Sequence, residues 1–170
     1  LTFKDIRETT FEGAIQAFQM MISNEYIKRD YLLELPNCLK GGNRDLFETI
    51  INTKATTIEL KNSLKLLSDA LYAYYQSPVI ILIDEYDRPI VDYIDPYDLT
   101  MANKQRDILK QFFSILKNAS NNIRFLLITG VSKFSKVSIF SELNHLDDLT
   151  LAPGCATLCG YTQTELTHYF

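Results

Sequence analysis

Two carboxylates, Asp84 and Glu85, directly follow an unbroken apolar run at positions 79–83. The run is rich in β-branched residues and has no polar alternation, so it predicts a strand that is buried on both faces. In open α/β sheets, ligands bind at the carboxyl ends of the strands. An acidic pair at such an end is costly to bury unless a cation lies beside it. Magnesium carried by a nucleoside triphosphate is the natural candidate for that cation.

The acidic pair resembles the Walker B element of a P-loop ATPase in its Asp-Glu form. The companion phosphate-binding motif, G-x-x-x-x-G-K-[ST], does not occur in the sequence. The adjacent glycines Gly41 and Gly42 are not followed by Lys-Ser or Lys-Thr. The sequence begins at Leu1 without Met and ends at Phe170 inside a predicted helix. We therefore expect it to be an internal segment of a longer protein.

Length and composition are those of one globular domain. The chain has 170 residues, of which 46% are hydrophobic, and this is enough to bury a core. Its net charge of −4 argues against a general nucleic-acid-binding surface. No apolar stretch is long enough to cross a bilayer. We therefore expect one partial domain over residues 1–170 and no insertion into a membrane.

The cysteines are few and odd in number: Cys38, Cys155 and Cys159. Such a set favours reduced thiols and a cytoplasmic location. His145 and His168 flank the last two cysteines, but the spacing matches no standard zinc module. We therefore expect these side chains to be unligated.

Helices are predicted from capping patterns and from apolar periodicity. Thr56 with Glu59, and Thr162 with Glu165, have the spacing of a capping box, and each pair predicts the start of a helix. Apolar residues at helical spacing predict the other helices, which cover residues 11–35, 45–51 and 101–117.

Strands are predicted from short apolar runs, which cover residues 1–3, 79–83, 124–129 and 148–151. Because these runs alternate with helices, they predict a parallel sheet with right-handed crossovers. The stretch 88–99, which contains Pro89 and Pro96, is predicted to be irregular and to lie at the surface.

Four blocks of the sequence resemble the bacterial AAA-ATPase-like family, and they occur in the family's order. The blocks are LTFKDI at 1–6, ILIDEYDRPI at 81–90, FLLITGVSKFS at 125–135, and LNHLDDLTL at 143–151 continuing into CGYT at 159–162. The region 31–55 matches least. The resemblance implies an α/β fold, namely a P-loop NTPase-like three-layer sandwich with a parallel sheet. It also implies that the sheet is truncated here, because the central phosphate-loop strand is missing.

The resemblance implies a role for each polar residue at these strand ends. Asp84 would hold the hydrated magnesium that bridges the terminal phosphates of ATP, and Glu85 would polarise the attacking water. Thr129, at the sensor position, would be catalytic and nucleotide-binding through a bond to the terminal phosphate or to the water. Ser132 and Lys133, in the turn that follows, are further candidates for binding the phosphates.

Each of these residues also has a purely structural interpretation. Asp84 and Glu85 would then be solvated acids at a capped strand end. Thr129 would have a hydroxyl that is satisfied within the protein, and Lys133 would be a solvated lysine. The neighbouring Asp87 would either add a carboxylate behind the site or cap the turn.

A geometric expectation follows from the strand ends. Because the two long apolar runs each end in a polar cluster, Asp84 and Thr129 are expected at the same edge of the sheet, on adjacent parallel strands. In the AAA+ strand order that the resemblance implies, the first, second and third predicted strands are neighbours, and the missing phosphate-loop strand separates the third from the fourth. The fourth strand, 148–151, is therefore expected about 10 Å from its nearest neighbour.

Two functions remain open at this point. In the first, the intact protein binds and hydrolyses ATP with magnesium, and the present segment alone is inactive. In the second, the domain is a nucleotide-gated regulatory module with little turnover that controls an attached effector domain. A scaffold that binds no nucleotide is a third, weaker alternative. The resemblance also implies a PD-(D/E)XK nuclease-like domain downstream in the same polypeptide as a partner.

Overall fold

The computed structural model of the chain describes most of its residues. The described residues are 1–8, 10–35, 38–91, 93–94, 99–117, 120–131, 146–158 and 160–169. Their α-helices are α1 (Phe11–Ile27), α2 (Gly42–Ile51), α3 (Thr57–Tyr75), α4 (Arg88–Val91), α5 (Thr100–Ser114) and α6 (Gln163–Tyr169). Short 3-10 helices are η1 (Asp30–Leu33), η2 (Ile115–Lys117), η3 (Ser120–Asn122) and η4 (Pro153–Cys155). The strands are β1 (Val79–Ile83) and β2 (Ile123–Ile128).

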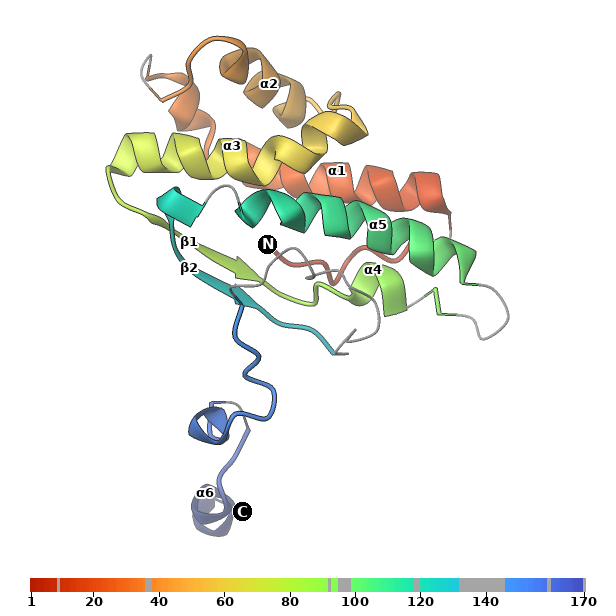
Figure 1. The fold of residues 1–170 in the computed structure, drawn as a ribbon, viewed down its shortest axis with the longest axis vertical. Coiled ribbons are helices and arrows are strands. Elements are labelled where there is room, and N and C mark those ends of the chain that lie inside the picture. Colours follow the sequence, from red (N-terminus) through yellow and green to blue (C-terminus); the bar gives the residue numbers. More distant parts are fainter. Residues whose placement is uncertain are drawn as a thin grey trace.

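Helices α1, α3 and α5 pack on one another and form a layer over one face of the sheet (Figure 1). Helix α2 packs on α1 and α3 from the side turned away from the sheet (Figure 1). The arrangement confirms the predicted α/β class with a parallel sheet. The three-layer P-loop sandwich remains a prediction, since the described helices cover only one face of the sheet.

The sheet is formed by β1 and β2, which pair in parallel from Val79 opposite Ile123 to Ile83 opposite Ile128. The N-terminal segment lies on the other side of β1, where Thr2 forms a parallel bridge with Asp84. This confirms the expected order of the first three predicted strands. The first predicted strand, residues 1–3, forms this single bridge and not a full strand. The bridge lies just beyond the end of β1.

Side chains alternate in burial along β1, so the prediction of a strand buried on both faces is wrong for the described residues. Ile81 and Ile83 are buried against the helical layer. Ile80 and Leu82 point the other way and are 57% and 56% exposed, and Phe125 opposite Ile80 is 51% exposed. The physical reason is that successive strand residues face opposite sides of a sheet, and no described helix lies over the second side.

Aromatic rings join the N-terminal segment to the helical layer. Phe3 lies 6.1 Å from both Phe18 of α1 and Phe113 of α5, measured between ring centroids. Phe112 makes an edge-on contact with Phe18 at 4.9 Å. Phe3, Phe112 and Phe113 are fully buried. This cluster fixes the N-terminal segment, and with it one side of β1, to the layer above the sheet.

Two capping boxes begin helices as predicted. At α3, the Glu59 N–H donates to the Thr56 hydroxyl at 3.3 Å, and the Thr56 N–H donates to the Glu59 carboxylate at 2.7 Å. Thr162 and Glu165 repeat the arrangement at α6. In both, the hydrogen bond from the threonine N–H lowers the pKa of the glutamate below its ordinary value.

The helix predicted over 11–35 ends earlier, at Ile27, and is followed by η1. The Arg29 side chain explains this end, because its guanidinium donates to the Glu25 carbonyl oxygen at 2.8 Å and satisfies a carbonyl of the last turn. The stretch 88–99 was predicted to be irregular and at the surface, which is wrong in part. Helix α4 forms there with Pro89 in its first turn, where proline fits, and Pro89 is buried.

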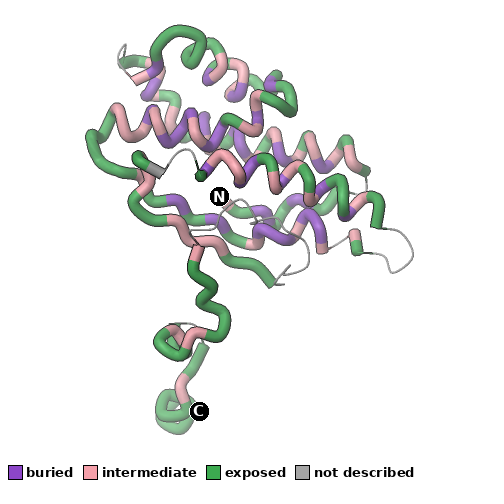
Figure 2. Tube along the Cα trace, in the orientation of Figure 1, coloured by how far each residue is buried: buried purple, intermediate pink, exposed green. Residues whose placement is uncertain are grey.

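The strand predicted over 148–151 is also wrong. The Thr150 N–H donates to the Asp148 carboxylate at 3.0 Å, which makes a local turn in place of strand pairing. Leu151 is 92% exposed. The described part of the segment from 147 onward extends away from the helical layer and contains no buried residue (Figures 1 and 2). Because residues 148–151 form no strand, the expected separation of about 10 Å between a fourth strand and its nearest neighbour cannot be assessed.

No helix among the described residues combines the length and the apolar character that crossing a membrane requires.

Candidate functional site

The carboxyl ends of β1 and β2 bring Asp84 and Thr129 together. The strands are in register up to Ile83 and Ile128, so the next residue of each lies side by side. The Thr129 hydroxyl donates to the Asp84 carboxylate at 2.6 Å, and the Thr129 N–H donates to the Ile83 carbonyl oxygen at 2.9 Å. The prediction that these two residues share one edge of the sheet, on adjacent parallel strands, is confirmed.

An open recess of about 420 Å³ lies at this edge. Its lining includes Leu82, Ile83 and Leu127 of the two strands, and Asp84 and Thr129 beyond the strand ends. The lining also includes Thr2 from the N-terminal segment. The recess therefore joins apolar residues to a carboxylate and a hydroxyl, which suits a ligand with an apolar part and a charged part.

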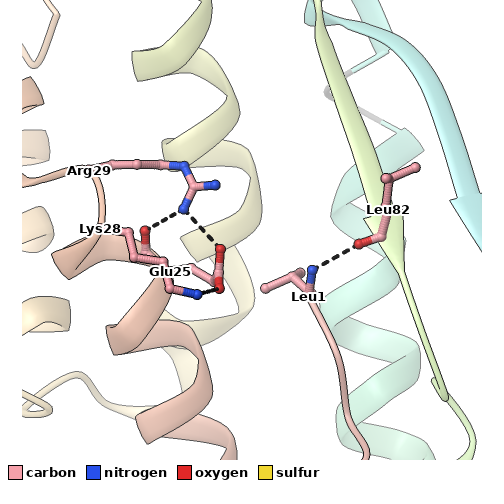
Figure 3. A network of polar contacts seen from close by, with 5 residues as sticks. All are labelled: Leu1, Glu25, Lys28, Arg29 and Leu82. Atoms are coloured by element: carbon pink, nitrogen blue, oxygen red, sulfur yellow. Dashed lines mark hydrogen bonds and ion pairs between the residues drawn. The ribbon is translucent and has the colours of Figure 1, made fainter.

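A second carboxylate, that of Glu25 on α1, also lines the recess. It accepts hydrogen bonds from the Lys28 ammonium at 2.6 Å and from the Arg29 guanidinium at 2.9 Å (Figure 3). Burial raises the pKa of Glu25, but the hydrogen bonds and charges of Lys28 and Arg29 outweigh it and hold the pKa below its ordinary value. Glu25 is thus ionised and already neutralised by two cations that follow directly after α1, which leaves it poorly suited to bind a further cation.

Asp84 differs from Glu25 in this respect. Its carboxylate is exposed, and within the described residues its side chain has Thr129 as its hydrogen-bond partner and no cationic partner. The backbone of Asp84 is fixed on the N-terminal side, because its N–H donates to the Leu1 carbonyl oxygen and its carbonyl accepts from Phe3. Leu1 continues this pairing through its backbone nitrogen, which donates to the Leu82 carbonyl oxygen at 2.9 Å (Figure 3). Asp84 is therefore the carboxylate in the recess that is free to meet a cation.

Glu85 follows Asp84 in the chain but does not line the recess. Its backbone has φ +52°, in the left-handed region, and its carbonyl accepts from the Arg88 N–H in a tight turn. A non-glycine residue in this region costs about 1–3 kcal/mol and occurs preferentially at functional sites. The structure shows no hydrogen bond or ion pair for the Glu85 carboxylate among the described residues, so this carboxylate is available to a ligand or a water.

The remaining predicted site residues, Ser132 and Lys133, lie outside the described residues. The structure therefore brings Asp84 and Thr129 together, places Glu85 beside them in a strained turn, and does not place the other two. Thr2 and Glu25 line the recess although no motif or spacing in the sequence singles them out. They reach it from separate elements, and only the packing of α1 and the N-terminal segment against β1 reveals them.

The side-chain oxygen atoms at this edge would suit magnesium better than a softer metal. Asp84 supplies a carboxylate and Thr129 a hydroxyl, and hard oxygen ligands of this kind are those that Mg²⁺ prefers. Within the described residues, no group of three or more His, Cys, Asp or Glu side chains is arranged to hold a metal ion. A single carboxylate is still sufficient for Mg²⁺ when water and phosphate oxygens complete its coordination.

Comparison with known proteins places this geometry in a family context. The model of the AAA-ATPase-like family, which is described as a predicted AAA-ATPase, matches residues 1–140. A protein of Azotobacter chroococcum mcd 1, described as an uncharacterized protein in the vnfD 5′ region, is 44% identical over 92 residues. That match covers 54% of this chain and 17% of the Azotobacter protein, so the chain corresponds to a small part of that relative's length. No solved structure matches the chain significantly.

Proposed function

Because this chain belongs to the AAA-ATPase-like family, we propose that it forms part of a domain that binds and hydrolyses ATP with magnesium. The observation that carries the proposal is the hydrogen-bonded pair of Asp84 and Thr129 at the carboxyl ends of two adjacent parallel strands. Ligands of open α/β sheets bind at such ends. In this proposal Asp84 and Glu85 are the Walker B pair.

Asp84 is the proposed magnesium ligand. It is exposed, it lines the recess, and it has no cationic partner within the described part of the chain. An uncompensated carboxylate would repel the phosphates of ATP, so a cation between them is needed to bring the two together. Magnesium, when bound, offsets the charge that develops on the transferred phosphoryl group.

Glu85 is the proposed general base. A carboxylate without a hydrogen-bond partner can accept a proton from the attacking water. The left-handed backbone of Glu85 turns the chain directly after Asp84. We propose that the two neighbouring carboxylates serve different tasks.

Thr129 is proposed to position the reacting groups. Its single hydroxyl proton is engaged with Asp84, which leaves its oxygen free to accept a hydrogen bond from a water. To donate to a phosphate oxygen instead, the hydroxyl has to turn away from Asp84. Ser132 and Lys133, which follow two and three residues after Gly130, are proposed as further phosphate ligands. A cytoplasmic location and a nuclease-like effector domain in the same polypeptide belong to the same proposal.

The Asp84 assignment is tested by replacing Asp84 with asparagine in the full-length protein. We expect wild type to bind ATP at least about tenfold more tightly with Mg²⁺ than with EDTA, and D84N to lose that difference, because the amide cannot compensate the metal's charge. A tenfold change corresponds to about 1.4 kcal/mol. Calorimetric titration with ATP measures both affinities.

The matched control is Asp45→Asn, which makes the same chemical change at an exposed position on α2. D45N is expected to keep the Mg²⁺ dependence of wild type. If D84N keeps it as well, Asp84 is not the magnesium ligand and the site has to lie elsewhere.

A further inference from the structure

Two hydrogen bonds, one between backbone groups and one to a side chain, tie the turn after β1 to the turn after β2. The Tyr86 N–H donates to the Thr129 carbonyl oxygen at 3.1 Å. The Val131 N–H donates to the Asp87 carboxylate at 3.2 Å. Asp87 is fully buried, with an exposed fraction of 0%. A carboxylate is rarely buried so completely, so its place behind the strand ends calls for a specific role.

Gly130 lies directly against Tyr86 and Asp87. A Cβ added to Gly130 would lie 2.5 Å from a ring carbon of Tyr86 and 2.8 Å from the Asp87 carboxylate. Real Cβ atoms do not approach other heavy atoms so closely, so this contact admits glycine alone. The two turns are therefore in direct contact, and Asp87 is at the centre of that contact.

Asp87 is itself fixed to the helical layer. Its carbonyl oxygen accepts from the N–H groups of Ile90 and Val91, both at 2.9 Å, so it stands at the start of α4. Pro89 and Ile90 of α4 are buried, and α4 packs on α5. A displacement of Asp87 would therefore require α4 to move against the core.

We propose that Asp87 is a positioning residue that holds the segment Thr129–Val131 against β1, and thereby keeps the Thr129 hydroxyl on Asp84. This inference rests on the proposed ATPase function, since its consequence for the reaction requires that Asp84 and Thr129 act there. Asp87 does not line the recess, so it acts through Thr129 and not on the nucleotide. A misplacement of reacting groups by about 1 Å can cost about 10²-fold in rate.

The test compares Asp87→Ala with Asp87→Asn in the full-length protein. D87A removes the acceptor of the Val131 N–H, whereas the side-chain carbonyl of asparagine keeps an acceptor of the same size. For D87A we expect kcat to fall by about 10- to 100-fold while KM for ATP changes by less than about threefold. For D87N we expect kcat within about threefold of wild type.

A second measurement reports on the turn without any ATP hydrolysis. Amide hydrogen exchange of the peptide that spans 124–131 is expected to be faster in D87A than in wild type, and unchanged in D87N. Gly130→Ala disturbs the same contact with Asp87 intact, so it is expected to raise exchange in the same peptide and to lower kcat. If D87A does not fold, the G130A variant still tests whether the contact between the two turns controls exchange and kcat.

The outcomes separate this inference from the proposed function. Faster exchange together with a lower kcat in D87A, both restored in D87N, supports it. Unchanged exchange in both D87A and G130A overturns it, whatever the ATPase activity. Faster exchange with a wild-type kcat also overturns it, but leaves the ATPase function intact. A wild-type protein that hydrolyses no ATP overturns the proposed function and, with it, the catalytic consequence of Asp87.

Discussion

Replacing Glu85 with glutamine is expected to slow ATP hydrolysis by the full-length protein about 10²- to 10⁴-fold, the range that a general base contributes. Glutamine keeps the size and hydrogen-bonding capacity of glutamate but cannot take a proton from water at neutral pH. Because the substitution keeps the shape of the side chain and removes only its ability to take a proton, ATP affinity is expected to stay within about threefold of wild type. Single-turnover hydrolysis and calorimetric ATP titration measure the two effects separately.

Glu34→Gln is the matched control, since Glu34 is an exposed glutamate that lies after η1 and does not line the recess. E34Q is expected to hydrolyse ATP at the wild-type rate. A wild-type rate for E85Q would remove Glu85 from the mechanism. If wild type binds ATP tightly but hydrolyses it no faster than a protein-free control, the domain is the nucleotide-gated regulatory module and not an ATPase.

Replacing Phe112 with alanine is expected to destabilise the chain of residues 1–170 by about 3–5 kcal/mol, which is the usual cost of deleting a buried aromatic ring. Phe112 is fully buried and contacts Phe18 and Phe113 with ring centroids 4.9 and 5.4 Å away. Its loss leaves a cavity between α1 and α5, at the layer that supports the sheet. Urea unfolding measures the change in free energy.

Phe125→Ala makes the same substitution on the exposed face of the sheet. Phe125 is half exposed, so its truncation is expected to cost less than about 1 kcal/mol in the same chain. A loss equal to that of F112A would mean that the second face of the sheet is covered in solution. The comparison thus tests whether the helical layer lies on one side of the sheet alone.

Features that depend on local sequence were predictable. The capping boxes at Thr56 and Thr162 form from residues three positions apart, so no distant contact is needed to establish them. The juxtaposition of Asp84 and Thr129 was also predictable, because apolar runs pair as parallel strands and their carboxyl ends then meet at one edge.

Features that depend on packing were not predictable. An apolar run indicates a strand, but it does not state whether a helix lies over each face, and for this reason the exposure of Ile80 and Leu82 was missed. The turn at Asp148 was missed because its side chain offers the backbone a local hydrogen bond that competes with strand pairing. The recess residues Thr2 and Glu25 come from elements far apart in the sequence, so no spacing could reveal them.

Iron-directed cleavage of the full-length protein tests the central claim most directly. Fe²⁺ takes the place of Mg²⁺ with ATP, and with ascorbate and peroxide it generates radicals that cut the backbone close to the metal. The account predicts cuts beside Asp84 and Thr129 that need ATP, that excess Mg²⁺ suppresses, and that D84N abolishes. Cuts confined to other parts of the protein, and unchanged in D84N, would contradict the assignment of the magnesium–ATP site to this edge of the sheet.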